Sequence, residues 1–142
     1  MPNHPYRKKW GQNFIEDNNV IKKIINVIDP NKKDSILEIG PGKGALTSYL
    51  IDTEKLSVVE IDPMLCSYLE KKFDDELIVI NQDILNLPLD HFSNYNKIVG
   101  NLPYYITTPI IFKILQYLSW DEAIFMVQKE VAERIVSLPG NK

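Results

Sequence analysis

Residues 35–47 read SILEIGPGKGALT, a short apolar run that passes into three glycines at alternate positions and then into a helical pattern. Glycines let a backbone approach a ligand closely and adopt φ values that other residues avoid. The spacing G-x-G-x-G, with Glu38 just before it, differs from the G-x-G-x-x-G of dinucleotide-binding folds. The stretch predicts a strand, a ligand-binding turn at Gly40 and a helix, with a tight turn that binds no ligand as the alternative.

Short apolar runs alternate with helical patterns along the rest of the chain. We expect strands at 35–39, 56–61, 77–80, 97–99 and 123–127, and helices at 18–28, 45–50, 64–73, 109–118 and 130–138. Thr108 before Pro109 is expected to cap the fourth helix. The alternation indicates an α/β fold with a doubly wound, mostly parallel sheet, whose ligand site lies at the carboxyl ends of the strands.

The composition predicts one soluble globular domain. The 142 residues are 44% hydrophobic and 25% charged, which excludes disordered, collagenous and coiled-coil classes. The apolar runs are too short to cross a bilayer and Met1 is followed by no apolar signal core, so we expect a cytoplasmic protein without a membrane partner. One cysteine, Cys66, and two distant histidines, His4 and His91, do not make a zinc site, so no metal is expected.

The charge is unevenly distributed along the chain. Residues 1–33 hold seven basic and three acidic residues, a balance of +4, whereas the whole chain has a net charge of -3. The first thirty residues are therefore the better candidate for contact with a polyanion. An equal alternative to polyanion contact is that these lysines are solvated on the outer faces of helices.

Acidic residues stand at the ends of the second and third runs. Glu60, twenty positions after Gly40, can accept hydrogen bonds from two hydroxyls of a ribose. Asp83 stands where a carboxylate can accept a hydrogen bond from the exocyclic amine of adenine, although an aspartate that only caps the next turn is the alternative. Together with the glycine turn, these acids favour a cofactor that contains adenosine.

The fourth run leads into Asn101, Leu102, Pro103 and Tyr104. The exocyclic amine of adenine is a poor nucleophile because its lone pair is delocalised, so an enzyme that methylates it needs acceptors for its N–H groups. The Asn101 side chain and the Leu102 carbonyl can be these acceptors, since Pro103 favours an extended backbone at Leu102. Tyr104 offers a face on which an unstacked base can stack. A polar turn whose tyrosines cover the sheet edge is the alternative.

In this order the motifs resemble those of the ribosomal RNA adenine dimethyltransferases, from about Tyr6 to Lys142. The resemblance rests on residues 11–15, 38–44, 60, 83, 101–104 and 125–131. It implies a Rossmann-like class I methyltransferase sheet and the cofactor S-adenosyl-L-methionine. The cofactor-binding residues it implies are Asn13, Ile15, Gly40 at the methionine end, Glu60 at the ribose, Asp83 at the adenine, and Asn101. Ile15 replaces a usual leucine, and the implied catalytic residues are Asn101, Leu102, Pro103 and Tyr104.

The branch of the family that the chain most resembles dimethylates two adjacent adenines near the 3′ end of small-subunit (16S) rRNA. The implied partner is 16S rRNA within a small-subunit assembly intermediate, and we expect a monomer. Three alternatives stay open: a large-subunit (23S) rRNA enzyme that confers macrolide resistance, a non-catalytic assembly or RNA-binding factor, and a nicotinamide-dependent oxidoreductase.

Members of this family continue for about as many residues again, with further strands and a small helical domain. We therefore expect residues 1–142 to be an incomplete N-terminal catalytic domain, truncated after the fifth strand and its helix. Such a fragment is expected to be weakly active or inactive, because an open sheet edge and a missing second stacking wall leave the substrate site incomplete.

Overall fold

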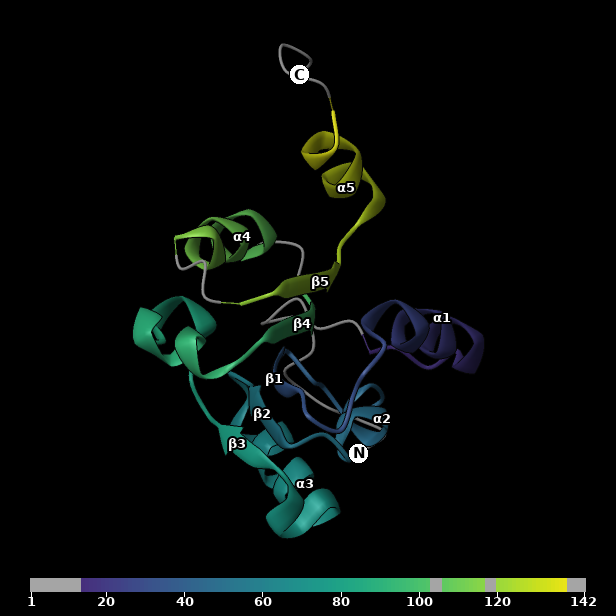
Figure 1. Cartoon of the computed structure of the whole chain (residues 1–142), viewed down its shortest axis with the longest axis vertical. Coiled ribbons are helices and arrows are strands. Elements are labelled where there is room, and N and C mark those ends of the chain that lie inside the picture. The colour runs from purple at the N-terminus through teal and green to yellow at the C-terminus, as the bar shows by residue number, and fades with distance from the viewer. Residues whose placement is uncertain (1–13, 103–105, 117–119, 138–142) are drawn as a thin grey trace.

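The centre of the molecule is a five-stranded parallel sheet (Figure 1). The computed structural model describes residues 14–102, 106–116 and 120–137. The strands are β1 (Ser35–Ile39), β2 (Lys55–Val59), β3 (Ile78–Ile80), β4 (Lys97–Asn101) and β5 (Glu122–Met126). Their order is β3-β2-β1-β4-β5, so the chain adds strands on one side of β1 and then on the other. The ends of β1 and β4 thus form the switch point at which such sheets bind ligands.

Helices and 3₁₀ turns cover both faces of the sheet, and Figure 1 shows α1 and α2 on one side and α4 on the other. The helices are α1 (Asn18–Ile28), α2 (Thr47–Leu50), α3 (Pro63–Phe73), α4 (Thr107–Leu115) and α5 (Lys129–Ile135), and the 3₁₀ turns are η1 (Asp74–Glu76), η2 (Ile84–Asn86) and η3 (Leu89–Asn94). The predicted doubly wound, parallel α/β fold is confirmed.

Two hydrophobic cores lie on opposite faces of the sheet. On one face, Ile21 and Ile28 of α1, Leu50 of α2 and Leu69 of α3 are buried against the strands. On the other, residues of η2, η3 and α4 are buried against the strands, among them Ile84, Phe92, Ile110 and Ile114. Alternate residues of a buried strand feed the two cores, as the apolar runs predict.

Local signals explain where α1 begins and ends. The Asp17 side chain caps its first turn by accepting a hydrogen bond of 2.8 Å from Asn19 N. Asp29, with a φ of 48°, adopts the left-handed conformation that ends the helix just before Pro30. The predicted bounds of 18–28 are confirmed.

The predicted start of α4 is wrong. The helix begins at Thr107, so Thr108 is helical and is no N-cap, and Ile106 stands at the cap position without a side-chain cap bond. Pro109 is therefore the third helical residue. A proline is tolerated there because the N–H groups of a first turn have no partner within the helix.

No helix in the described ranges is long and apolar enough to cross a bilayer. The described residues also contain no group of three or more His, Cys, Asp or Glu side chains arranged to hold a metal ion.

Candidate functional site

The glycine turn lies at the switch point of the sheet. Gly40 has a φ of 67°, and a Cβ built on it would come within 3.1 Å of the backbone oxygen of Asn101 at the end of β4. Its N–H donates a hydrogen bond of 2.9 Å to the Val59 carbonyl at the end of β2. A side chain at Gly40 would be strained and would crowd the space between β1 and β4, so glycine keeps this space open.

The Glu60 carboxylate joins the turns that follow β1 and β2. One oxygen, Oε1, accepts a hydrogen bond of 3.3 Å from Gly42 N, and Oε2 accepts one of 3.0 Å from Asp62 N. Glu60 is only 4% exposed, and burial raises its pKa to about 7. A carboxylate has about four acceptor positions, so two backbone donors leave acceptor capacity for hydroxyl groups of a ligand.

The backbone carbonyl of Glu60 is also held in place. Asn81 Nδ2, after β3, donates to this carbonyl at 2.9 Å and to the Ile61 carbonyl at 3.2 Å. The Cys66 thiol donates to the Glu60 carbonyl at 3.4 Å, and burial raises the pKa of this thiol to about 12. Cys66 is thus a protonated structural donor, and three successive strand ends are tied together around Glu60.

Glu38 lies below the glycine turn and does not reach the surface. It is 1% exposed, and the hydroxyl of Thr47 in α2 donates a hydrogen bond of 2.6 Å to Glu38 Oε1. Burial raises the pKa of Glu38 to about 7, and the nearby Glu60 contributes to the rise. The acid before the glycines therefore joins β1 to α2, a contact that sequence reasoning missed.

Asp83 stands at the N-cap of η2, three residues after the end of β3. Its Oδ1 accepts a hydrogen bond of 3.0 Å from Leu85 N. One of its two carboxylate oxygens therefore caps the turn, as in the capping alternative. The side chain is half-buried at the same edge of the sheet as Glu60. Its role toward adenine stays a prediction.

Asn101 ends β4, beside the glycine turn, and is half-buried. Leu102 is buried, and its N–H donates a hydrogen bond of 3.2 Å to the Met126 carbonyl of β5. The structure thus brings Gly40, Glu60, Asp83 and Asn101 to one edge of the sheet. Three predicted site residues, Asn13, Pro103 and Tyr104, lie outside the described residues.

The segment before α1 packs against the site. A Cβ built on Gly42 would lie 2.8 Å from the Phe14 ring, and Lys43 Nζ lies 5.1 Å from the centroid of that ring. Ile15 is half-buried and packs against the core that α1 shares with the sheet. Phe14, which sequence reasoning did not single out, therefore borders the glycine turn.

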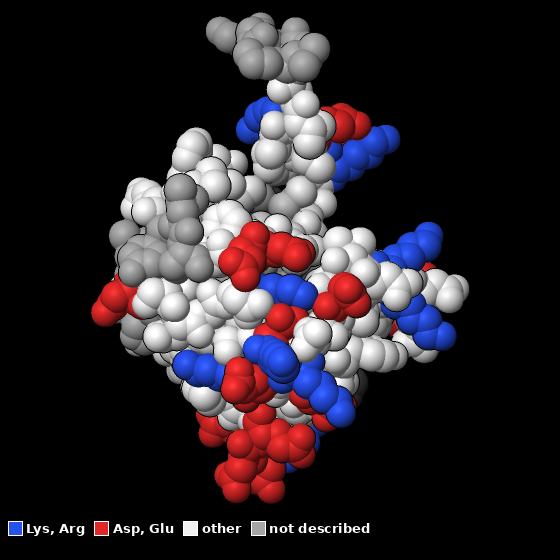
Figure 2. Space-filling model, viewed as in Figure 1, with Lys and Arg blue, Asp and Glu red and all other residues white. Residues whose placement is uncertain are grey.

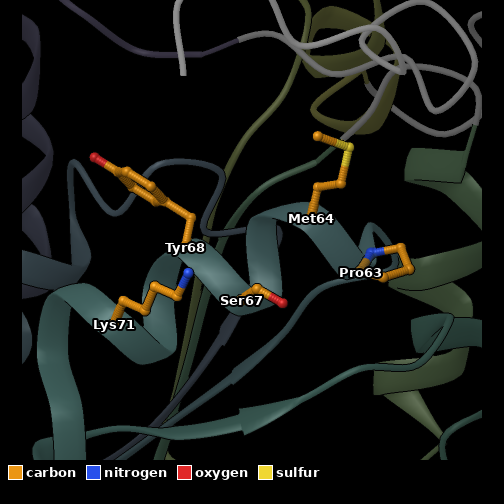
Figure 3. A pocket seen from close by; sticks show the side chains of 5 residues that line it. All are labelled: Pro63, Met64, Ser67, Tyr68 and Lys71. Carbon is orange, nitrogen blue, oxygen red and sulfur yellow. The ribbon is translucent and has the colours of Figure 1, made fainter.

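Charged side chains of both signs are interspersed over much of the face in Figure 2. Acids gather at its lower end, where η1 has the sequence Asp74-Asp75-Glu76. A hollow follows one side of α3 and is lined by Pro63, Met64, Ser67, Tyr68 and Lys71 (Figure 3). Of the predicted site residues that the structure describes, none lines this hollow.

Comparisons with known proteins find similarity over nearly the whole chain. The family model described as "Ribosomal RNA adenine dimethylase" matches residues 3–142. "Ribosomal RNA small subunit methyltransferase A" of Malacoplasma penetrans is 43% identical over 138 residues, which are 95% of this chain and 50% of that protein. The protein of the same name from Mycoplasma mycoides is 47% identical over 139 residues, which are 92% of this chain and 52% of the relative.

Two solved structures share this fold at 30% and 29% sequence identity. A dimethyladenosine transferase from Plasmodium falciparum has a TM-score of 0.81 at 29% identity, over 91% of this chain and 48% of that one. The 23S rRNA methyltransferase ErmE has a TM-score of 0.75 at 30% identity, over 85% of this chain and 50% of that one. The chain spans about half the length of the curated relatives it matches.

Proposed function

The chain belongs to the ribosomal RNA adenine dimethylase family, and from that premise we propose that it serves methyl transfer from S-adenosyl-L-methionine to the exocyclic amine of adenine in ribosomal RNA. The proposed target is two adjacent adenines near the 3′ end of 16S rRNA, in an assembly intermediate of the small subunit. The names of the bacterial relatives support this choice of subunit. The hydrogen bond from Gly42 to Glu60, which joins the glycine turn to a strand-end acid, carries the proposal.

The residues at the switch point fit this cofactor. Gly40 leaves open the space that a Cβ would fill, which suits close approach of the methionine end. Two backbone donors orient the buried Glu60 carboxylate, and its remaining acceptor positions suit the ribose hydroxyls. Asp83 suits the adenine amine. When bound, the cofactor would supply a methyl group on a sulfonium, whose sulfur leaves as a neutral thioether and needs no metal for its activation.

We assign the target amine to the residues that follow β4. The side-chain oxygen of Asn101 and the carbonyl of Leu102 accept its two N–H groups, which draws the nitrogen lone pair out of conjugation with the ring. Pro103 orients that carbonyl, and Tyr104 stacks on the base. After transfer the amine loses its proton to water, so the reaction needs no dedicated base within these residues.

We extend the proposal to the surroundings of the enzyme. Residues 1–142 belong to its catalytic domain, which acts as a monomer in the cytoplasm, where small subunits are assembled. Asn13 and Ile15 border the cofactor, a placement supported by the contact of the neighbouring Phe14 with the glycine turn. The basic segment 1–33 faces phosphates of the RNA.

A large-subunit target is the second candidate. The similarity to ErmE, a 23S rRNA methyltransferase, favours it. The curated relatives are more similar to this chain, at 43% and 47% identity against 30% for ErmE, and their names specify the small subunit. We therefore place the small-subunit target first.

Two measurements test the proposal. Calorimetric titration with S-adenosylhomocysteine, S-adenosylmethionine and NAD identifies the cofactor, and heat with NAD alone would refute the proposal. Primer extension on 16S and 23S rRNA, after incubation of the whole protein with both subunits, locates the methylated adenines. Stops at adjacent adenines of 16S rRNA support the proposal, stops only in 23S rRNA support the second candidate, and cofactor binding without methylation supports a non-catalytic assembly factor.

A further inference from the structure

Lys113 is the one charged residue of α4, whose sequence is TTPIIFKIL. Its Nζ donates hydrogen bonds to two backbone carbonyls of η2, at 2.9 Å to Ile84 and at 2.7 Å to Leu85. The helix contacts both η2 and η3, and Figure 1 shows it beside the teal turns that follow β3. Lys113 therefore links α4 to a turn about thirty positions earlier in the chain, as the separations of 29 and 28 residues show.

The turn that Lys113 contacts is the one that carries Asp83. Leu85 is bound on both sides of its backbone, since its N–H donates to Asp83 Oδ1 and its carbonyl accepts from Lys113. Asp83 and Lys113 also interact electrostatically, although burial lowers the pKa of Lys113 below its ordinary value. A displacement of Leu85 would thus move the Asp83 carboxylate directly.

The other end of α4 is close to the residues after β4. The helix begins at Thr107, five residues after Leu102, and Thr107 is 1% exposed. Ile110 and Ile114 are buried in the same core as Ile84, so apolar packing already holds α4 against η2. A lysine is not needed for that packing. Its ammonium group, with three donors and no acceptor, serves the two carbonyls instead.

We propose that Lys113 is a positioning residue for cofactor recognition, which clamps the Asp83 turn onto α4 and so directs the Asp83 carboxylate toward the adenine amine. This inference rests on the proposed function, because it assumes that the ligand carries adenine. The inference gives α4 a role in selecting the nucleobase of the cofactor. The helix also follows Asn101 and Leu102, the proposed acceptors for the target amine.

The test compares two ligands that differ at one group. S-inosylhomocysteine carries an oxygen where S-adenosylhomocysteine carries the exocyclic amine, so this position presents an acceptor instead of a donor to Asp83. Calorimetry gives both dissociation constants for the wild-type chain, Lys113→Met and Lys113→Arg, with Lys55→Met as the matched control. Lys55 contacts the Tyr95 ring at 4.9 Å and has no part in the turn. We expect a preference for adenine of at least about tenfold in the wild type, the control and Lys113→Arg.

In Lys113→Met we expect this preference to fall to about threefold or less while the variant stays folded. An unchanged preference in Lys113→Met would overturn the inference and leave the proposed function intact. A wild-type chain that binds neither ligand would overturn both.

A second measurement needs no ligand. The Leu85 amide should exchange with solvent about tenfold faster in Lys113→Met than in the wild type, and the Leu56 amide in β2 should not change. Equal exchange at Leu85 in the two proteins would refute the clamp. Should Lys113→Met fail to fold, Lys113→Gln, whose polar end is too short to reach both carbonyls, replaces it in both measurements.

Discussion

The N–H of Gly42 donates a hydrogen bond of 3.3 Å to Oε1 of Glu60, eighteen positions later in the chain. This hydrogen bond joins the glycine turn after β1 to the acidic turn after β2, which the sequence patterns identified separately. A ligand that contacts the glycine turn also meets a carboxylate that this turn has oriented. The site is thus built from contacts between strand ends rather than from single motifs.

Glu60→Ala should weaken the binding of S-adenosylhomocysteine by about 2 kcal/mol, or roughly thirtyfold, because hydrogen bonds from the ribose to the Glu60 carboxyl group are lost. Calorimetry at constant pH measures the change. Glu54→Ala is the matched control, since Glu54 is exposed and precedes β2. Equal affinities of the two variants would remove Glu60 from the cofactor site.

The stability of the domain should fall as the pH rises from about 5 to above 7. Burial raises the pKa of Glu38 to about 7, above its ordinary value, so the folded state binds more protons than the unfolded state between these limits. The stabilisation is complete below the unfolded pKa and is lost as the pH passes through 7. In Glu38→Gln, which keeps an acceptor for Thr47, urea midpoints should depend less on pH. A steeper dependence in the variant would contradict this account.

Sequence patterns predicted the strands and α1 well because those signals are local. Apolar runs mark β1 to β5, and Asp17 and Asp29 flank α1. The start of α4 was missed because Pro109 is as acceptable in the third helical position as in the first. The predicted strand-end residues lie at one edge of the sheet because parallel strands end together.

The side-chain hydrogen bonds between residues in different elements of the fold could not be predicted from the sequence. A sequence shows that α4 contains one lysine, but it does not show that Lys113 reaches carbonyls of η2. The same holds for Thr47, whose hydroxyl reaches Glu38 from the other side of the glycine turn. The roles of all the predicted site residues stay predictions, and Asn13, Pro103 and Tyr104 lie outside the described residues.

Gly100→Ala should destabilise the domain by about 2 kcal/mol. A Cβ at this position would lie 2.8 Å from the Ile39 carbonyl oxygen and 3.1 Å from the Ile39 Cβ, so β1 and β4 would have to separate. Urea unfolding measures the loss, with Ser67→Ala on the exposed side of α3 as the control. A cost no larger than that of the control would show that the strands adjust without strain.

Asn101→Ala should reduce methyl transfer in the whole protein by at least about a hundredfold while cofactor affinity falls much less, because an acceptor for the target amine is lost. Single-turnover transfer to small subunits and calorimetry give the two values. Asn94→Ala, an exposed change in η3, is the control. Equal losses of transfer and binding would contradict the acceptor role.

A buried ion pair fixes the opposite end of the sheet. Lys97 Nζ lies 2.9 Å from Asp34 Oδ2 and donates to the carbonyls of Ile28 at 2.9 Å and Asp29 at 3.0 Å. Burial by itself would raise the pKa of Asp34, but hydrogen bonds from Asn96 and Lys97 bring it below its ordinary value. Lys97 thus joins β4, the turn before β1 and the end of α1.

Lys97→Met should lower the free energy of unfolding by about 3 kcal/mol, because a buried carboxylate loses its cation while two carbonyls lose a donor. Urea unfolding measures this loss against Lys33→Met, an exposed neighbour whose change should stay within about 0.5 kcal/mol. Adding Asp34→Asn to Lys97→Met should recover part of the loss, since it removes the uncompensated charge. A double variant whose loss equals the sum of the two single losses would show that Asp34 and Lys97 are not coupled and that Asp34 is stabilised by Asn96 and the backbone alone.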